Sequence, residues 1–433
     1  MPHYLLTVLL TCSCCLLQAQ AYYFPPASGD SWASTDPAEL GWCTENIDSL
    51  YAFLEEENTK AFLVVKDGKI VLEKYFGSYQ QDSVWYWASA GKSLTAFLIG
   101  LAQDQGLLSI EDKVSEYLGT GWTSLSPSQE DKITIKNQLS MDTGLDDGVS
   151  DPFCTEPACL QYKAEPGERW AYHNGPYTLL SNVLESATGL TENQYTFRQL
   201  NGKTGITGLW IPSGYNRIFF STARTMARFG VLIQNQGVWD GDTLLSDQSY
   251  FQDMITSSQG LNPAYGYLWW LNGQSTYKLP GLQFDFPGEI SPNAPSDMFA
   301  AMGKNGQILN IIPSENLIVV RMGNNPNNSL VPTSFQNEMW ERINQLPCAN
   351  STSIRDNISL DAHLYPNPSS GMLGISLPLQ TAPYEVTIFD QSGRRLLQVK
   401  NQSEINMEEF PSGLYYVRLL QNQQAYVGKW IKR

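Results

Sequence analysis

Histidine is scarce in this sequence. Three histidines occur among 433 residues, and His173 is the only one between residues 22 and 361. A Ser-His-Asp triad would therefore have one available base, and neither a G-x-S-x-G elbow nor an H-E-x-x-H zinc motif is present. If the protein is a hydrolase, a serine activated by lysine is the economical alternative.

The apolar stretch at the start of the chain is too short to cross a bilayer. It runs from Leu5 to Leu17 and is followed by A-Q-A at residues 19–21, a small-x-small pattern typical of signal-peptidase sites. We therefore predict a cleaved signal peptide over residues 1–21 and no transmembrane segment, although the stretch has no Lys or Arg before it. A lipoprotein acylated at Cys12, Cys14 or Cys15 is the alternative.

Cysteines are few and lack metal-binding spacing. After residue 21 only Cys43, Cys154, Cys159 and Cys348 remain, and no C-x-x-C occurs. An even number in an exported protein indicates two disulfides, for which three pairings exist. The tight loop F-C-T-E-P-A-C favours Cys154 with Cys159, and Cys43 with Cys348 would then join the ends of the main domain. A metal site is the weaker interpretation, and we expect no metal or cofactor.

Basic residues are also in short supply. There are 27 Lys and Arg against 43 Asp and Glu, a net charge of −16. Binding to nucleic acid or to an anionic membrane would be electrostatically repulsive, so neither partner is expected. Residues 362–433 differ, with seven basic and five acidic side chains. This shift indicates a separate C-terminal module.

Residues 22–348 mix helical and hairpin patterns. Asp67-Gly68 between two apolar runs predicts a hairpin, and the apolar spacing after Ser89 predicts a buried helix. We expect the other main elements as helices at 45–58, 177–186, 222–236 and 335–345, and two late strands within 307–322. These elements predict an α+β fold: an antiparallel sheet flanked by helices, with an inserted all-α lobe at about 107–255.

The end of the chain reads differently. Residues 349–361 are polar and are predicted to form a linker. Residues 362–433 contain short alternating segments separated by turn residues, which indicates a small C-terminal β-sandwich.

Ser89 and Lys92, in W-A-S-A-G-K-S-L, are the candidate catalytic pair. Three residues apart on a helix they share one face, and the N-terminus of that helix favours negative charge beside the hydroxyl. A lysine in a closed, partly apolar site has a lowered pKa and accepts the serine proton. A second S-x-x-K at Ser275 and Lys278 lies in a predicted loop or strand, where the two side chains would point to opposite faces.

Further along, Tyr172-x-Asn174 stands in R-W-A-Y-H-N-G-P-Y. Ser89-x-x-Lys92 followed by Tyr172-x-Asn174 and a late K-x-G resembles the serine β-lactamase and penicillin-binding-protein superfamily. W-A-S-A-G-K-S-L together with L-S-M-D-T-G-L is similar to its branch of β-lactamase-related esterases and peptidases. The resemblance extends over about residues 43–345 and implies the α+β fold of that superfamily.

The third motif of this superfamily has two possible positions. Lys203-Thr204-Gly205 is a literal K-T-G, but a proline soon follows it, whereas K-N-G at residues 304–306 opens a hairpin that leads to the last helix. The superfamily places the motif beside the nucleophile late in the domain, so we choose Lys304 and Gly306. Asn305 departs from the usual Thr or Ser and weakens the expectation that Lys304 holds a substrate carboxylate.

The resemblance implies acyl transfer in two steps. Ser89 would attack a carbonyl, and Lys92 and Tyr172, the latter as a phenolate stabilised by Lys304, would share the roles of base and acid. The backbone N–H groups of Ser89 and Gln307 would form the oxyanion hole, and Asn174 would anchor substrate or orient Lys92. His173 is expected to be structural.

The tail resembles the C-terminal sorting domain of type IX secretion substrates. Four features carry this resemblance: Y-P-N-P at residues 365–368, D-x-x-G-R at 390–394, G-x-Y at 413–415 and the basic end K-W-I-K-R at 429–433. It implies recognition by the type IX secretion machinery, removal of the tail, and release or attachment at the cell surface. A carbohydrate-binding sandwich is the alternative for this module.

These patterns together predict a secreted serine hydrolase that acts on a small-molecule or peptide ester or amide. An esterase, an amide-oligomer hydrolase, a D-amino-acid carboxypeptidase and a true β-lactamase are not separated by the sequence. The alternative from another class is a binding protein that kept the fold without turnover.

Overall fold

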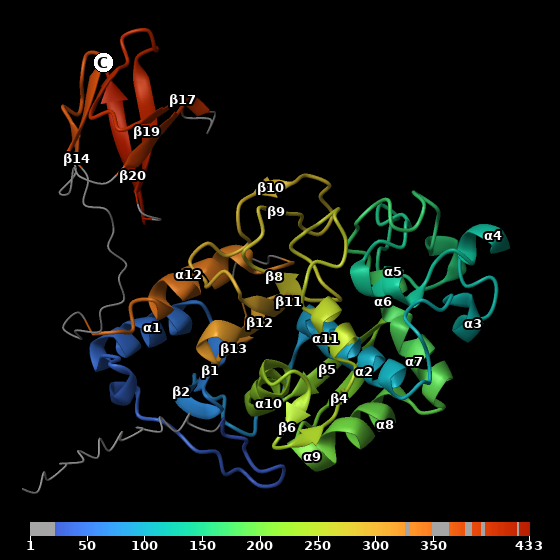
Figure 1. The fold of residues 1–433 in the computed structure, drawn as a ribbon. Coiled ribbons are helices and arrows are strands. Elements are labelled where there is room, and N and C mark those ends of the chain that lie inside the picture. The colour runs from blue at the N-terminus through green and yellow to red at the C-terminus, as the bar shows by residue number, and fades with distance from the viewer. Residues whose placement is uncertain (1–21, 325–329, 349–362, 377–382, 391–394, 422–423) are drawn as a thin grey trace, which may run out of the picture. The chain divides into compact units, whose positions relative to one another are not determined.

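The computed structural model describes residues 22–324, 330–348, 363–376, 383–390, 395–421 and 424–433 (Figure 1). The predicted signal peptide and linker, and Gly393 and Arg394 of the tail, lie outside these residues. The chain divides into two units, Met1–Ser351 and Thr352–Arg433. Within the described residues, no helix combines the length and apolarity needed to span a membrane.

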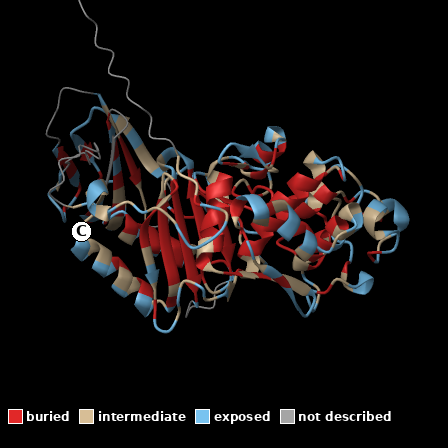
Figure 2. Ribbon diagram, turned by 90° about the horizontal axis from the view of Figure 1, so that it is seen from below, coloured by how far each residue is buried: buried red, intermediate tan, exposed pale blue. Residues whose placement is uncertain are grey.

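The first unit is built on a six-stranded antiparallel sheet with the strand order β2-β1-β13-β12-β11-β8. Its strands are β1 (Thr59–Lys66), β2 (Lys69–Tyr75), β8 (Trp270–Leu271), β11 (Phe299–Gly303), β12 (Gln307–Ile312) and β13 (Leu317–Gly323). Every residue of β11, β12 and β13 is buried. Apart from Gln307, Asn310 and Arg321, these strands contain only apolar residues and glycine, because both of their faces are covered (Figure 2).

Helices cover the two faces of this sheet. On one face α1 (Thr44–Glu56) and α12 (Thr333–Ile343) share an apolar cluster with the strands, to which α12 contributes Met339 and Trp340. A disulfide between Cys43 and Cys348 joins the segment before α1 to the segment after α12, with a Cα–Cα distance of 5.1 Å. On the other face α2 (Gly91–Asp104) and α10 (Ala223–Gln234) belong to the larger core.

Helix α2 is the centre of the larger core, because its side chains are buried continuously from Gly91 to Ala102. Gly100 permits a close approach on one side, since a Cβ atom there would lie 2.3 Å from the ring of Tyr250. The Tyr250 hydroxyl donates to the carbonyl oxygen of Ala96 at 2.6 Å. The helix that follows Ser89 is therefore held rigidly.

A lobe of short helices packs beyond α2 (Figure 1). It comprises α3 (Ser115–Leu118), α4 (Pro127–Glu130), α5 (Ile135–Ser140), α6 (Asn174–Thr178), α7 (Leu180–Thr188), α8 (Glu192–Thr196), α9 (Gly202–Thr204) and α11 (Gln248–Met254). A small sheet of order β3-β5-β4 lies beside it and consists of β3 (Trp85–Tyr86), β4 (Leu209–Ser213) and β5 (Asn216–Ser221). The short hairpins β6 (Val238–Trp239) with β7 (Asp242–Thr243), and β9 (Thr276–Tyr277) with β10 (Phe286–Pro287), complete the unit.

The second unit consists of two small antiparallel sheets. One has the order β14-β15-β18 and the other β17-β16-β19-β20. Their strands are β14 (His363–Tyr365), β15 (Met372–Ser376), β16 (Tyr384–Phe389), β17 (Arg395–Lys400), β18 (Glu404–Asn406), β19 (Gly413–Gln421) and β20 (Gln424–Lys432). Leu373, Val417 and Trp430 belong to its apolar core.

The predicted fold class is confirmed: a helix-flanked antiparallel sheet, a helical lobe and a strand-rich C-terminal region. Three local details differ from the expectations. The inserted lobe, predicted to be all-α over about residues 107–255, also contains strands, because β4 pairs with β5 and β6 with β7 across tight turns. Ser89 lies in a 3-10 turn, η2 (Ala88–Ala90), directly before α2 rather than in the first turn of α2. Strand β11 was not anticipated, because its sequence F-A-A-M-G has little intrinsic strand propensity and takes its conformation from pairing with β8 and β12.

Candidate active site

The Ser89 turn is anchored from both sides. The N–H of Trp87 donates to the carbonyl oxygen of Phe219 at 2.8 Å, and its indole Nε1 donates to Ser221 Oγ at 2.7 Å. On the other side lies Gly303, where an added Cβ atom would stand 2.4 Å from the oxygen of Trp87 and 3.0 Å from the nitrogen of Ser89. Only glycine permits this approach of β11 to the turn.

Lys92 lies in a closed, largely aromatic environment. Its side chain is 4 % exposed, Nζ donates to Asn174 Oδ1 at 2.9 Å, and Nζ lies 3.4 Å from the ring centroid of Tyr177. Burial lowers the pKa of Lys92 well below its ordinary value. The amine is therefore biased toward the neutral form that accepts a proton.

Tyr172 lies beside Ser89 and Lys92. Its ring stacks on Trp270 with the centroids 5.8 Å apart, and Nζ of Lys92 lies 5.4 Å from the ring centroid of Tyr172. Burial raises the pKa of Tyr172, and a side-chain hydrogen bond with Ser89 opposes that rise only in part. Burial therefore favours the protonated phenol of Tyr172, and its role in proton transfer stays a prediction.

Asn174 begins α6, and His173 precedes it without reaching the cavity. His173 is buried, and neither ring nitrogen has a hydrogen-bond partner in the described part of the chain. Burial lowers the pKa of His173 to about 4, so the ring is neutral near pH 7. This placement fits a structural residue.

Lys304 follows β11 in the turn to β12. Asn305 is turned away from the cavity, because its Nδ2 donates to the hydroxyl of Tyr86 at 2.7 Å. Gln307 is fully buried, and its side chain exchanges hydrogen bonds with the main chain of Gly323. Lys304 lines the cavity, whereas Gly306 and Gln307 do not.

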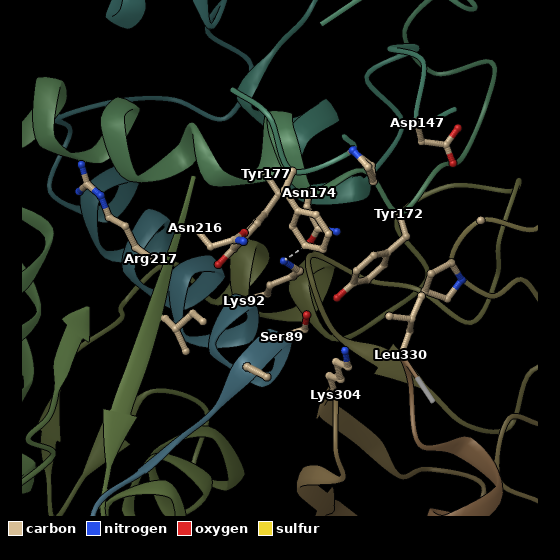
Figure 3. Close-up of a pocket in the computed structure, with 16 residues that line it drawn as sticks. Ser89, Lys92, Asp147, Tyr172, Asn174, Tyr177, Asn216, Arg217, Lys304 and Leu330 are labelled. Atoms are coloured by element: carbon tan, nitrogen blue, oxygen red, sulfur yellow. Dashed lines mark hydrogen bonds between the residues drawn. The ribbon is translucent and has the colours of Figure 1, made fainter. Parts of the chain in front are cut away.

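The cavity has a volume of about 310 Å³ and brings five of the predicted site residues together. These are Ser89, Lys92, Tyr172, Asn174 and Lys304. Figure 3 shows Ser89 between Lys92, Tyr172 and Lys304, with Asn216 and Arg217 on one side and Leu330 on the other. Ser89 and Lys92 come from one turn and the helix after it. In the cavity they meet Tyr172 and Asn174 from one distant segment and Lys304 from another.

The segment directly before the second disulfide forms part of the cavity wall. Cys154 and Cys159 are bonded with a Cα–Cα distance of 5.9 Å, and Pro152 and Phe153, which precede them, line the cavity. This segment is docked on α6, because the N–H of Gly175 donates to the carbonyl oxygen of Pro152 at 2.9 Å. A Cβ atom at Gly175 would lie 2.5 Å from the oxygen of Cys154, so glycine is required for this contact.

Sequence patterns did not reveal the polar residues of the cavity rim. Arg217 lines the cavity and pairs with Glu185 at 2.5 Å, and Asp147 lines it and pairs with Arg169 at 2.6 Å. None of these residues stands in a recognisable motif. Their position in the site depends on how the loops fold back.

The two rejected motifs lie elsewhere. Lys278 forms an ion pair with Asp285, and neither Ser275 nor Lys278 lines the cavity. Lys203 lies in α9 with an exposed side chain 4.0 Å from Asp242, also outside the cavity. Neither the second S-x-x-K nor the K-T-G sequence therefore lies in the cavity that contains Ser89.

The family model described as "Beta-lactamase" matches residues 54–334, most of the first unit. The chain belongs to the β-lactamase family. Members of this family are generally serine hydrolases, and some are non-catalytic. The family model described as "Secretion system C-terminal sorting domain" matches residues 363–433. The tail is thus a type IX sorting domain, which indicates a secreted or cell-surface protein and the type IX machinery as its partner.

Curated relatives of this β-lactamase-family chain are distant. An uncharacterised protein of Alkalihalophilus pseudofirmus is 25% identical over 300 residues, 60% of this chain and 82% of that protein. Penicillin-binding protein 4* of Bacillus subtilis is 25% identical over 200 residues, 40% of each chain. The 6-aminohexanoate-dimer hydrolase of Paenarthrobacter ureafaciens is 23% identical over 272 residues, 53% of this chain and 68% of that enzyme.

Solved structures share the fold. A putative 6-aminohexanoate-dimer hydrolase from Bacillus anthracis has a TM-score of 0.56 and 19% identity, covering 76% of this chain and 91% of that one. A family VIII carboxylesterase has a TM-score of 0.53 and 15% identity, covering 69% and 96%. At these identities the likeness concerns the fold alone.

Among the described residues, no group of three or more His, Cys, Asp or Glu side chains is arranged to hold a metal ion.

Proposed function

We propose that this protein is a secreted serine hydrolase that cleaves an ester or amide through an acyl-enzyme on Ser89. The observation that carries the proposal is Lys92: a buried amine with a lowered pKa, three residues from Ser89, lining the same cavity. Its environment offers an amide oxygen and an aromatic ring but no paired carboxylate among the described residues. A neutral amine in this place is suited to act as a general base.

The acylation step uses three side chains. Neutral Lys92 accepts the proton of Ser89 Oγ as this oxygen forms a bond to the substrate carbonyl carbon. The tetrahedral intermediate then collapses, the bond to the leaving group breaks, and Tyr172 donates its phenolic proton to that group. Lys92 returns its proton to Tyr172, and a water molecule hydrolyses the acyl-enzyme in the second half of the cycle.

Asn174 orients the base. Its Oδ1 accepts one N–H of Lys92 at 2.9 Å while the Tyr177 ring lies against the same amine. A lysine side chain has many rotamers, and these two contacts select one of them. The lone pair of the amine is thereby directed to the remaining side, where Ser89 lies.

Two backbone N–H groups would stabilise the oxyanion. The first is that of Ser89, and the resemblance assigns the second to Gln307. The geometry supports Lys304 as a rival for the second donor, because Lys304 lines the cavity directly after Gly303, which packs against the Ser89 turn. Both candidates belong to the same tight turn.

Besides Lys92, the cavity combines apolar groups with Lys304 and with two ion-paired side chains, Arg217 bonded to Glu185 and Asp147 bonded to Arg169. Pro152, Phe153, Pro280 and Leu330 supply apolar surface, and Lys304 forms no ion pair with any described residue. An ester or amide with an apolar chain and a carboxylate fits this lining. Related proteins named as carboxylesterase, 6-aminohexanoate-dimer hydrolase and penicillin-binding protein are consistent with either ester or amide cleavage.

The deciding experiment compares wild type with Ser89→Ala by intact mass after exposure to a fluorophosphonate, a p-nitrophenyl ester and a penicillin, with product release followed in parallel. We expect a Ser89-dependent adduct and ester turnover. A long-lived penicilloyl adduct would indicate a cell-wall peptide substrate, and rapid penicillin hydrolysis would indicate a true β-lactamase. If no probe labels Ser89 and nothing turns over, the chain is a binding protein on this fold.

A further inference from the structure

Arg321 is a fully buried cation behind the active-site turn. It lies on β13 with 0 % of its surface exposed. Among the described residues it forms no salt bridge, and burial lowers its pKa to about 9 although Glu57 opposes this shift. Burying a charge without a paired carboxylate is costly, so an arginine at this place calls for a compensating role.

All five N–H groups of Arg321 are used, and every acceptor is neutral. Nη1 donates to the carbonyl oxygens of Asn305 at 2.9 Å and Gly306 at 3.0 Å, both in the turn that carries Lys304. Nη2 donates to the main-chain carbonyl oxygens of Glu57 at 2.6 Å and Asn324 at 3.0 Å. The remaining donor, Nε, bonds Thr59 Oγ1 at 3.0 Å, and the guanidinium lies 4.7 Å from the ring centroid of Phe335.

These contacts connect the turn to a rigid part of the molecule. Glu57 caps the C-terminus of α1, and Thr59 begins β1, which lies between β2 and β13 in the main sheet. The guanidinium is planar and presents its donors at fixed angles, so it holds the two carbonyl oxygens of the turn in one orientation. Asn305 is held a second time by its bond to Tyr86, the residue directly before Trp87, which is the N-cap of the Ser89 turn.

We propose that Arg321 is a positioning residue for the acyl-transfer site: it fixes the turn at residues 304–306 against the Ser89 turn and so aligns the second oxyanion donor. Both candidate donors, the N–H groups of Lys304 and Gln307, lie on or next to this turn. The bond to the Gly306 carbonyl also polarises the peptide group whose N–H belongs to Gln307. The inference rests on the proposed function above.

Arg228 provides a matched control. It is another buried arginine, 7 % exposed, that donates to main-chain carbonyl oxygens, those of Pro25 and Thr204, and lies over an aromatic ring, that of Trp32. None of its contacts involves the cavity or the turn at residues 304–306. Replacement of Arg228 therefore disturbs two buried hydrogen bonds to main-chain carbonyl oxygens, against five hydrogen bonds of Arg321, and leaves the oxyanion donors untouched.

The test compares Arg321→Lys with Arg228→Lys in the full chain, using melting temperature, kcat, KM and the rate constant of Ser89 acylation. We expect both variants to lose stability. Only Arg321→Lys should lower kcat and the acylation rate, by about 10- to 100-fold, with KM changed less than about threefold, because an oxyanion donor contributes in the transition state and one such donor is worth about 10²–10³.

A milder pair of variants serves if Arg321→Lys does not fold. Thr59→Val removes only the acceptor of Nε, and Thr196→Val removes a buried hydroxyl that accepts from Trp210 Nε1 at 3.0 Å away from the turn. We expect kcat to fall severalfold in Thr59→Val and to stay unchanged in Thr196→Val. Equal kcat in either pair, or a change confined to KM, overturns the positioning role while leaving Ser89 labelling intact. Failure of Ser89 to label at all contradicts the proposed function itself.

Discussion

Lys92 Nζ donates to Asn174 Oδ1 at 2.9 Å, which joins the helix after the nucleophile to a segment 82 residues further along the chain. The contact takes place in a site from which water is largely excluded, since Lys92 is 4 % exposed. A hydrogen bond of this kind orients the amine, and burial lowers its pKa and so favours the neutral form. The predictions below follow from this arrangement.

Removal of the base should abolish most activity. Lys92→Met keeps the length and apolar character of the side chain, so we expect the protein to fold and kcat/KM to fall by about 10²–10⁴, the usual contribution of a general base. Lys203→Met is the control, because Lys203 belongs to the K-T-G sequence outside the cavity. Ester hydrolysis by purified variants checks this; equal losses in both variants would contradict a role for Lys92.

The pH profile should report Lys92. Activity requires the neutral amine, so kcat/KM should rise with pH through the pKa of Lys92, which burial lowers well below that of an ordinary lysine. Tyr172 acts in its protonated form, and its raised pKa places any alkaline loss above the usual range of a tyrosine. A profile of kcat/KM from pH 5 to 10 checks this; activity appearing only near the pKa of a free lysine, about 10.4, would contradict it.

Tyr172 should matter most when the leaving group is poor. Tyr172→Phe removes the proton donor, so we expect kcat to fall about 10²–10³-fold for an alkyl ester or amide. The loss should be much smaller for a p-nitrophenyl ester, whose leaving group departs without protonation. Tyr162→Phe is the control, because Tyr162 is exposed and lies outside the cavity. The same loss with all leaving groups would favour a role for Tyr172 in the base step instead.

The two disulfides should have separable effects. Replacing Cys43 and Cys348 with alanine opens a closure over 305 residues and should lower the free energy of unfolding by roughly 2–5 kcal/mol. Replacing Cys154 and Cys159 opens only a short loop, so the free energy of unfolding should fall little. Phe153 directly precedes this loop and lines the cavity, so KM should rise. Denaturant unfolding and steady-state kinetics distinguish these outcomes. The same changes of stability and KM in both double variants would contradict the separate roles of the two disulfides.

Much of the fold was predictable because local signals were strong. Asp67-Gly68 between apolar runs marks the hairpin of β1 and β2, and the apolar periodicity after Ser89 marks α2. Strand β11 gave no comparable signal, because alanine and glycine have little strand propensity. Its pairing with β8 and β12, which are separated from one another in the sequence, supplies the hydrogen bonds that define it.

The candidate site divides in the same way. Ser89-x-x-Lys92 and Tyr172-x-Asn174 were identified by spacing, and the order of the motifs selected Lys304 over Lys203. Spacing did not identify Arg217, Phe153 and Arg321, because their places at the site depend on contacts between segments far apart in the chain.

The sequence by itself determined which residues are the candidates for proton-transfer chemistry, since side-chain type and local spacing are written in it directly. It also determined the secretion tail, through turn and strand motifs close together in the chain. Only the tertiary structure decided how Lys92 is buried against Tyr177, and hence its lowered pKa, because desolvation is a property of all surrounding atoms. The tertiary structure likewise placed Gly303 against Ser89 and Arg321 behind the turn, since close packing brings together groups that no local pattern relates.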